Sequence, residues 1–530
     1  MNDNLHPHWR IVPWLLCSAV LVSGALLASA TWAFAVRDSK PSNSGSRQQD
    51  TTEASSEAVH KMCAACHAYP APDTFPRSAW RKEVKQGFDF FLADPSLRFP
   101  YPSLESVVRY YENRAPSSLP APSRAPNAPA RVRFEPEAVP STKGTGAPGA
   151  AYVGLVHLFH KDKLDILVCD AINKQILVLS PYESSPAWKV IASGFTSAHA
   201  EVVDLDGDGI NDVLLACLGH FYATDDFVGS VVWLKGAKDH TFAPQVLLDG
   251  IGRVADVRAA HFFGTSKFDL VVAEFGWHQK GGILLLENQT TDWSKPQFKS
   301  HLVDNRHGAT HVPVADLNGD GKPDFVALLS QEHESVIAFL NEGGGKFRKE
   351  LIYAAPSPSF GCHGIQVVDL DKDGSLDVIL ANGDSLDAPF ILKPYHGLTW
   401  LKNLGSYPFT PQRLTDCYGA GSPITADFDG DGRLDIAIVS FLPGDSFPTR
   451  VADRLDSVAL LMQVEKGKFV RQSVETGICD HLTCAAGDLN GNGKPDLVIG
   501  NYVRGGQPGS PITVLRNVTE MPKRTASSKP

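Results

Sequence analysis

The sequence predicts a mainly β fold, a seven-bladed β-propeller at residues 131–517, preceded by a small α-helical domain and an N-terminal transmembrane helix. Three observations carry this prediction: an uncharged N-terminal run, a short segment with helical spacing of its apolar residues, and an aspartate-rich motif that recurs along the chain. A chain of 530 residues is too long for one ordinary core and indicates several units or a repeat architecture. The formal net charge of −10, with no basic run, argues against nucleic-acid binding.

The N-terminal run Ile11–Val36 contains no charge and is long enough to cross a bilayer as a helix. Arg10 precedes it, which favours an N-terminus kept in the cytoplasm. We therefore expect residues 1–36 to form a single-pass signal anchor in the cell membrane. A cleaved signal peptide is the alternative, because residues 33–35 have the A-x-A form of a cleavage site. Both interpretations place the bulk of the chain on the extracytoplasmic side, in the periplasm or at the cell surface.

After a polar linker at residues 37–57, the segment 58–115 carries Cys63, Cys66 and His67 in a C-x-x-C-H arrangement. In an exported protein this is the signature of covalent c-type haem attachment. Two thiols one helical turn apart can bond to the two vinyl groups of the porphyrin, and the adjoining imidazole becomes an axial ligand of the iron. We expect one haem c here, with His67 as its iron ligand.

Other uses of the two cysteines are less well supported by their context. A thioredoxin-like motif would need a βαβ setting, and a structural zinc site would need a second ligand pair, whereas the next cysteine is Cys169. A disulfide between the two cysteines is the remaining alternative.

The spacing of apolar residues predicts three short helices in this segment, within residues 55–66, 76–92 and 103–116. We expect their aromatic residues to pack around the haem. The second axial ligand is not evident, because Met62 adjoins the motif and no histidine follows until His157. Either the iron is five-coordinate, or water or a histidine of the later domain supplies the far ligand.

Beyond a proline-rich linker at residues 116–130, a nine-residue motif returns with oxygen-bearing side chains at positions 1, 3, 5 and 9. That spacing places oxygens around one point, as calcium requires, and glycine at position 6 permits the sharp bend. We expect up to five calcium ions, bound by Asp204, Asp206, Asp208 and Asp212; by Asp316, Asn318, Asp320 and Asp324; by Asp369, Asp371, Asp373 and Asp377; by Asp427, Asp429, Asp431 and Asp435; and by Asp488, Asn490, Asn492 and Asp496.

These loops differ from an EF-hand, because strand-like runs flank them and position 12 is apolar. The number of carboxylates falls from four in the loops at 204, 369 and 427 to three at 316 and two at 488. We therefore expect the last loop to lose its ion first on chelation. Two weaker copies, at 157–165 and 261–269, keep only Asp165 and Asp269.

Each of the seven copies is followed by further strand-like runs, and four strands per repeat of this length are typical of a propeller blade. The seventh copy has only three strands before a polar tail at 518–530. The run at 132–140 resembles the missing strand, so we expect it to join the last blade and close the ring.

This pattern resembles the FG-GAP, or VCBS, repeat family, which forms the seven-bladed propeller of integrin α subunits. The resemblance covers about residues 131–517 and is specific at the five acidic loops. It implies the fold and calcium loops, but it does not identify a ligand, since such propellers serve adhesins, lyases and redox proteins.

Polar residues recur where the innermost strands begin, at one mouth of the propeller channel. The candidates for a site there are His199, Asp256, Arg258, His311, His363 and His481. Propellers commonly bind small ligands at this place, although the same residues could simply cap strand ends. Cys479 and Cys484 lie close to this region, and a bridge between them is possible in an oxidising compartment.

Three classes of function remain open. The first is an electron-transfer protein, in which the haem accepts or passes electrons and the propeller docks a redox partner protein or a small-molecule or carbohydrate ligand. The second is an oxidoreductase with its active site at the channel mouth and the haem as its internal electron acceptor. The third is a non-enzymatic surface module for binding or adhesion.

Overall fold

The computed structural model describes residues 52–121, 126–142, 146–386, 390–506 and 508–520. The expected signal anchor at 1–36 and most of the linker at 37–57 lie outside the described residues. Within the described ranges, no helix combines the length and apolar character needed to span a bilayer.

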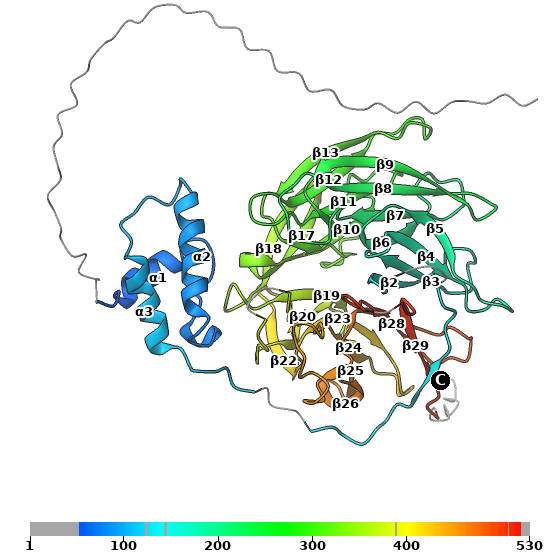
Figure 1. Cartoon of the computed structure of the whole chain (residues 1–530). Coiled ribbons are helices and arrows are strands. Elements are labelled where there is room, and N and C mark those ends of the chain that lie inside the picture. The colour runs from blue at the N-terminus through cyan, green and yellow to red at the C-terminus, as the bar shows by residue number, and fades with distance from the viewer. Residues whose placement is uncertain (1–51, 122–125, 143–145, 387–389, 507, 521–530) are drawn as a thin grey trace, which may run out of the picture. The chain divides into compact units, whose positions relative to one another are not determined.

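The predicted helical segment contains three α-helices and one 3-10 turn (blue in Figure 1). They are α1 (Ser56–Cys63), η1 (Pro72–Thr74), α2 (Trp80–Ala93) and α3 (Leu104–Arg114). The N-cap of α3 is Ser103, whose hydroxyl accepts a hydrogen bond of 3.3 Å from the backbone N–H of Ser106. The helix α2 begins four residues after Pro76, because Pro76 to Ala79 form a turn of their own.

The helical segment has an apolar core built from its own side chains. The apolar stripe of α2, which includes Trp80, Val84 and Phe88, packs against residues of α3 such as Val107 and Tyr111. The rings of Trp80 and Tyr111 are stacked with centroids 3.9 Å apart. The aromatic residues that we expected to surround a haem thus make close contacts with one another.

The rest of the described chain forms seven antiparallel sheets, each a meander of neighbouring strands (Figure 1). Blade 1 contains β2 (Ala150–Val156), β3 (Asp165–Asp170), β4 (Gln175–Leu179) and β5 (Lys189–Ser193); blade 2 contains β6 (Ser197–Val203), β7 (Asp212–Cys217), β8 (Gly229–Gly236) and β9 (Phe242–Ile251); and blade 3 contains β10 (Val254–Ala260), β11 (Asp269–Glu274), β12 (Gly282–Asn288) and β13 (Phe298–Asp304). Blade 4 contains β14 (Ala309–His311), β15 (Val314–Ala315), β16 (Asp324–Leu329), the 3-10 turn η2 (Gln331–His333), β17 (Ser335–Gly343) and β18 (Lys346–Ala354); and blade 5 contains β19 (Cys362–Val368), β20 (Asp377–Asn382), β21 (Gly397–Lys402) and β22 (Thr410–Asp416). Blade 6 contains β23 (Ala420–Ala426), β24 (Asp435–Ser440), β25 (Asp456–Glu465) and β26 (Lys468–Thr476); and blade 7 contains β27 (His481–Gly487), β28 (Asp496–Asn501) and β29 (Ile512–Asn517), with β1 (Phe134–Glu137) as its fourth strand.

The innermost strands form the ring. The strand β2 of the first blade lies against β27 of the last and against β6 of the second, and the remaining first strands contact each other in the same sequence. The second strand of each blade is buried along nearly its whole length, since neighbouring blades cover both of its faces. In blade 4 the first strand is divided into β14 and β15, on either side of Pro313, which has no N–H for the ladder.

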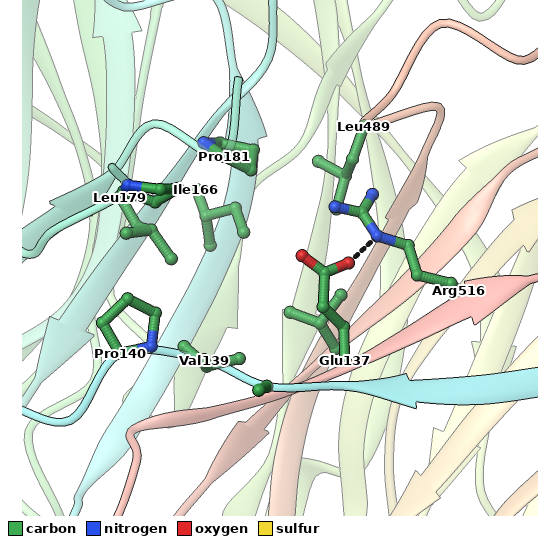
Figure 2. Close-up of a pocket in the computed structure, with 11 residues that line it drawn as sticks. Glu137, Val139, Pro140, Ile166, Leu179, Pro181, Leu489 and Arg516 are labelled. Carbon is green, nitrogen blue, oxygen red and sulfur yellow. Dashed lines mark hydrogen bonds and ion pairs between the residues drawn. The ribbon is translucent and has the colours of Figure 1, made fainter. Parts of the chain in front are cut away.

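The predicted closure of the ring by an N-terminal strand is confirmed. The strand β1 pairs antiparallel with β29, with Phe134 opposite Asn517 and Glu137 opposite Val514. The side chain of Glu137 forms an ion pair with Arg516 beside a small, mostly apolar cavity of about 110 Å³ (Figure 2). This pairing covers the edge that β29 would otherwise expose.

Side-chain amides also fasten blades to each other. Asn341 Nδ2 donates to the carbonyl of Phe262 in the preceding blade at 3.2 Å. Asn517 makes the same contact with the carbonyl of Phe428, at 2.8 Å. These amides stand at the end of the third strand, a position that our sequence analysis did not single out.

No disulfide forms between Cys479 and Cys484, and both are free thiols. The sulfur of Cys484 lies 3.5 Å from the carbonyl of Ser422, whereas that of Cys479 lies 3.6 Å from the hydroxyl of Ser457. The two thiols therefore occupy different surroundings, one against β23 and the other against β25.

Candidate functional sites

The five acidic loops share one backbone arrangement at the turn between the first and second strands of their blades. In the first, the carboxylate of Asp204 accepts a hydrogen bond of 2.9 Å from the N–H of Gly209. That glycine has φ +84°, a conformation that residues with a side chain rarely adopt. The same contact joins Asp427 to Gly432, also at 2.9 Å. Glycine at position 6 is thus explained by the turn.

Three of these loops gather three carboxylates around one point. In each, one oxygen from positions 1, 3 and 9 lies within 4.8 Å of the other two. The three groups are Asp204, Asp206 and Asp212; Asp369, Asp371 and Asp377; and Asp427, Asp429 and Asp435. The side chains at position 5 mainly serve the turn, since Asp208 and Asp373 accept the N–H two residues on at 2.9 and 3.0 Å.

The loops with amides have the same turn but fewer charges. Asn318 Oδ1 accepts the N–H of Asp320 at 2.9 Å, and Asn490 Oδ1 accepts that of Asn492 at 3.1 Å. These two residues take the place of the acid at position 3.

A cation accompanies the acid at position 3 in each loop with four carboxylates. Lys235 pairs with Asp206, and Lys402 pairs with Asp371. Arg131, from the segment before β1, lies 2.7 Å from Asp429. Sequence reasoning missed these cations, although Lys235 and Lys402 occupy the same place at the end of the third strand.

Some carboxylate oxygens in these loops are buried and accept no hydrogen bond from the described residues. Asp371 Oδ1 and Asp427 Oδ1 are buried and have no hydrogen-bond partner within the described residues. Burial raises the pKa of Asp435 to about 7 and that of Asp377 to about 6. Buried carboxylate oxygens without a hydrogen-bond partner are the chemical setting in which a hard cation binds.

The aspartate at position 9 has a second role in every blade. It begins the second strand, is fully buried, and accepts a backbone N–H from the loop. The donor is the second loop residue in the five acidic loops, as in the 3.1 Å contact from Leu205 to Asp212, and the third in the other two loops. Its other oxygen accepts an N–H from the end of the third strand in six blades, for example from Gly236 at 2.7 Å, and the hydroxyls of Ser180 and Tyr182 in the first blade. This explains why Asp269 survives in a loop without other acids, where it accepts from Phe263 and Asn288.

Three of the channel candidates, His199, Arg258 and His311, lie around the buried carboxylate of a fourth, Asp256. Its Oδ1 lies 3.0 Å from both His199 Nδ1 and Arg258 Nε. Although burial opposes ionisation, the charges of Arg258 and His199 hold the pKa of Asp256 far below its usual range. His311 Nε2 contacts the carbonyl of His363 at 3.1 Å, and burial lowers the pKa of His311 to about 4.

Two further residues belong to this group and were not singled out from the sequence. Glu201 lies 3.7 Å from Arg258 and accepts the N–H of Ala259 at 3.1 Å. The ring of Tyr152 lies edge-on to His199, with centroids 4.5 Å apart. Glu201 could have been found from the sequence, because it follows His199 by two positions on β6 and alternate residues of a strand point to the same face.

His481 differs from the other candidates. It is buried, and its Nε2 lies 2.7 Å from Glu475 on β26 of the preceding blade. The side chains of the network around Asp256 thus come from blades 1 to 4, and blade 5 adds the backbone carbonyl of His363. His481 instead joins blades 6 and 7.

The C-x-x-C-H residues lie at the end of α1. Cys63 is its last residue and half-buried, whereas Cys66 is exposed. The ring of His67 contacts the carbonyl of Ala68 through Nδ1 at 2.8 Å, which leaves Nε2 free for another partner. Both thiols are unbonded.

Comparison with known proteins supports the repeat. A family model described as FG-GAP-like repeat matches residues 316–380, and one described as FG-GAP repeat matches residues 484–515. No curated protein matches the chain. The molecule is thus a seven-bladed β-propeller that carries FG-GAP repeats.

Two similar solved structures are crystal structures of BBS1N in complex with ARL6DN, one soaked with lead and one with mercury. The first is 11% identical with a TM-score of 0.42, and the alignment covers 74% of this chain and 98% of that chain. The second is 11% identical with a TM-score of 0.43 and the same coverage, 74% and 98%.

Proposed function

We propose that the protein is a membrane-anchored, extracytoplasmic c-type cytochrome with one haem, whose calcium-binding propeller docks a redox partner or a small ligand for electron transfer. The observation that carries this proposal is the Cys63-x-x-Cys66-His67 motif at the end of α1. The uncharged N-terminal run, which would export the chain, gives the motif its meaning.

The residues around the motif fit a covalently bound haem. The thiols of Cys63 and Cys66 are free, as thioether formation requires. The bond between His67 Nδ1 and a backbone carbonyl is the usual support of a metal-ligating histidine, since it directs Nε2 toward the metal. The hydroxyl of Tyr111 is buried without a hydrogen-bond partner in the described part of the chain. Haem would supply a one-electron carrier at this place.

Calcium is proposed for the five acidic loops. The buried, unpartnered oxygens of Asp371 and Asp427 support this assignment, as does the positive-φ glycine in each turn. The ions would brace the turn between the first two strands of a blade. On titration with a chelator, the loop at 488, with two carboxylates, should release its ion before the loop at 427, with four.

The docking part of the proposal rests on the network around Asp256, where buried polar groups from several blades meet. Such a group of charges can orient a polar ligand at the channel mouth. The same network also supports the second class, an oxidoreductase, and the propeller fold supports the third, a binding or adhesion module. Covalent haem distinguishes the first two classes from the third.

The test is to produce the full chain in a host with the c-type haem maturation system and to measure haem by a denaturing gel stain and pyridine haemochrome spectrum. We expect one covalent haem per chain, absent after Cys63→Ser with Cys66→Ser. A colourless protein, with both thiols unmodified in the intact mass, would refute the cytochrome assignment and leave the propeller as a binding module.

His60 provides a matched control for the axial ligand. It lies on α1, one turn before the motif, with its ring stacked 3.7 Å from that of Tyr69. We expect His67→Ala to alter the ferrous spectrum and His60→Ala to leave it unchanged. The same result for both variants would contradict the assignment of His67.

A further inference from the structure

A group of histidines lies at the end of the propeller opposite the acidic loops. In a four-stranded antiparallel blade, the turn between strands one and two is at one end, and the turn between strands two and three is at the other. The connection from strand four to the first strand of the next blade lies at the same end as the turn between strands two and three. His278 is in the turn between β11 and β12, His307 is between β13 and β14, and Glu332 is between β16 and β17.

Backbone hydrogen bonds hold these three connections together. The N–H of Gly308 donates to the carbonyl of Phe275 at 2.8 Å, and the N–H of Ser330 donates to the carbonyl of Gly308 at 2.7 Å. Gly308 has φ +84°, and a Cβ there would lie 2.7 Å from the carbonyl oxygen of Ser330. The approach of the three connections therefore depends on this glycine.

Carboxylates fix the outer parts of the same connections. Asp225, from blade 2, accepts the backbone N–H groups of His278, Gln279 and Lys280, each at 3.1 Å. Glu334 accepts the N–H of Cys362 in blade 5 at 2.7 Å. The ligand-bearing residues are thus supported from both sides, as binding sites require.

Residues on either side of Glu332 adopt an uncommon backbone conformation. Gln331 has φ +58° and Glu334 has φ +36°, in the left-handed region. Strained residues of this kind are concentrated at functional sites. Here they turn Glu332 and His333 toward His307.

The side chains form a compact group of ligand atoms. One atom each from His278, His307 and Glu332 lies within 4.8 Å of the other two. His307 Nε2 is 2.8 Å from Glu332 Oε1, yet this nitrogen has no aligned hydrogen-bond partner within the described residues. Two atoms that bind the same metal ion through bonds of about 2.1 Å lie about 3 Å apart, and they need no hydrogen-bond geometry between them.

The three side chains offer a ligand set of mixed type. His278 and His307 supply ring nitrogens, and Glu332 supplies a carboxylate oxygen.

We propose that His278, His307 and Glu332 bind one divalent transition-metal ion, such as zinc, at the end of the propeller opposite the acidic loops. Two imidazoles and a carboxylate favour this class of ion, whereas calcium prefers oxygen ligands alone. Three protein ligands leave a coordination position open for water or substrate. His333, whose ring lies 4.9 Å from that of His307 and whose Nε2 is buried without a partner among the described residues, is the neighbouring group at that position.

This site does not depend on the proposed haem or on the calcium loops, because it shares no residue with either. His301 provides a matched control, since its Nε2 lies 2.8 Å from Glu287 on the strands β12 and β13, in a histidine–glutamate pair without a third ligand. If a histidine–glutamate pair were enough to bind the ion, substitutions of His301 and of His307 would weaken zinc binding equally.

The experiment is a zinc titration of the full chain against a chromophoric chelator, in the presence of excess calcium. We expect one equivalent of zinc that calcium does not displace. His278→Gln, His307→Gln and Glu332→Gln should each weaken binding at least tenfold, and His301→Gln should leave it unchanged. Melting curves of each variant without zinc show whether the fold is retained.

Cobalt supplies a second measurement on the unmodified protein. Bound Co²⁺ should show d–d bands without a thiolate charge-transfer band, because the ligands are nitrogen and oxygen. The proposal would be overturned if no equivalent bound, if calcium displaced the zinc, or if Cys63→Ser with Cys66→Ser abolished binding. A change of the haem spectrum in His278→Gln, with zinc binding unaltered, would also overturn it.

Discussion

The backbone N–H of Asn288 donates a hydrogen bond of 2.9 Å to Oδ1 of Asp269, in a loop that has lost every other acidic position. The other carboxylate oxygen accepts the N–H of Phe263 at 3.1 Å. Asp269 therefore joins the start of the second strand to the end of the third and to the loop between strands one and two. This role requires no metal, and it accounts for the aspartate that all seven repeats retain.

The first prediction concerns Asp269→Asn. An amide can present one oxygen but not two to the pair of N–H donors, so one buried donor loses its partner. We expect a loss of about 1–3 kcal/mol in the free energy of unfolding, equal with and without calcium. Urea denaturation in calcium and in chelator measures both values.

Asp320→Asn is the control for this prediction. Asp320 is at position 5 of the loop at 316 and accepts an N–H at 2.9 Å from Lys322. We expect Asp320→Asn to lower the free energy of unfolding mainly when calcium is present. An Asp269→Asn protein as stable as the wild type would show that the buried aspartate is dispensable.

The second prediction concerns the cation beside an acidic loop. Lys402 pairs with the buried Asp371, so it competes with calcium for that carboxylate. Lys402→Met should tighten calcium binding at the loop at 369 several-fold, since a competing charge is removed. Without calcium the same variant should be destabilised, because Asp371 then lacks its closest counter-charge.

Calcium titration and thermal melting in chelator test the two effects together. Lys85→Met is the control, because Lys85 is exposed and forms its ion pair with Asp89 within α2. Weaker calcium binding in Lys402→Met would mean that the lysine supports the loop and does not compete with the ion.

The third prediction concerns closure of the ring. Val132, just before β1, is 3% exposed and packs in the core between the last two blades. Val132→Ala should cost about 2 kcal/mol of stability, as expected for a buried methyl pair with a cavity left behind. Val190→Ala, on the outer strand β5 where the side chain is 52% exposed, should cost much less. Equal effects would indicate that residues before β1 do not contribute to the ring.

The ring was predictable because its signals are local and repeated. Each aspartate loop, with its glycine at position 6, marks the same turn, and a missing strand at one end matches a spare strand at the other. The grouping of His199, Asp256 and His311 followed from their common place in the repeat. His481 occupies the same place but contacts Glu475 in the neighbouring blade, because side-chain direction at a strand start depends on local packing.

The histidine group at the opposite end could not be predicted in the same way. His278, His307 and Glu332 stand in three connections of different length and have no common position in the repeat. Their approach depends on backbone bonds such as that from Gly308 to Phe275, which no sequence pattern marks. The cations at the acidic loops were similarly hidden, since Arg131 comes from a segment far away in the chain.

The last prediction concerns pH and the channel network. Burial raises the pKa of Glu201 to about 7, although Arg258 opposes the shift. Between the unfolded value of about 4.5 and this folded value, the native protein holds a proton that the unfolded chain has released. Raising the pH through this range therefore lowers the stability contributed by Glu201. In Glu201→Gln the group cannot ionise, so that loss is absent.

We expect the free energy of unfolding of Glu201→Gln to rise by about 1–3 kcal/mol relative to that of the wild type when the pH is raised from about 5 to about 8. Urea denaturation of both proteins at several pH values gives the difference directly and cancels the titration of His199 and His311. Glu475→Gln is the matched control, since Glu475 pairs with a buried histidine outside the network. A difference between wild type and Glu201→Gln that stayed constant with pH would mean that Arg258 keeps Glu201 ionised throughout, and the channel would then present a permanent charge to its ligand.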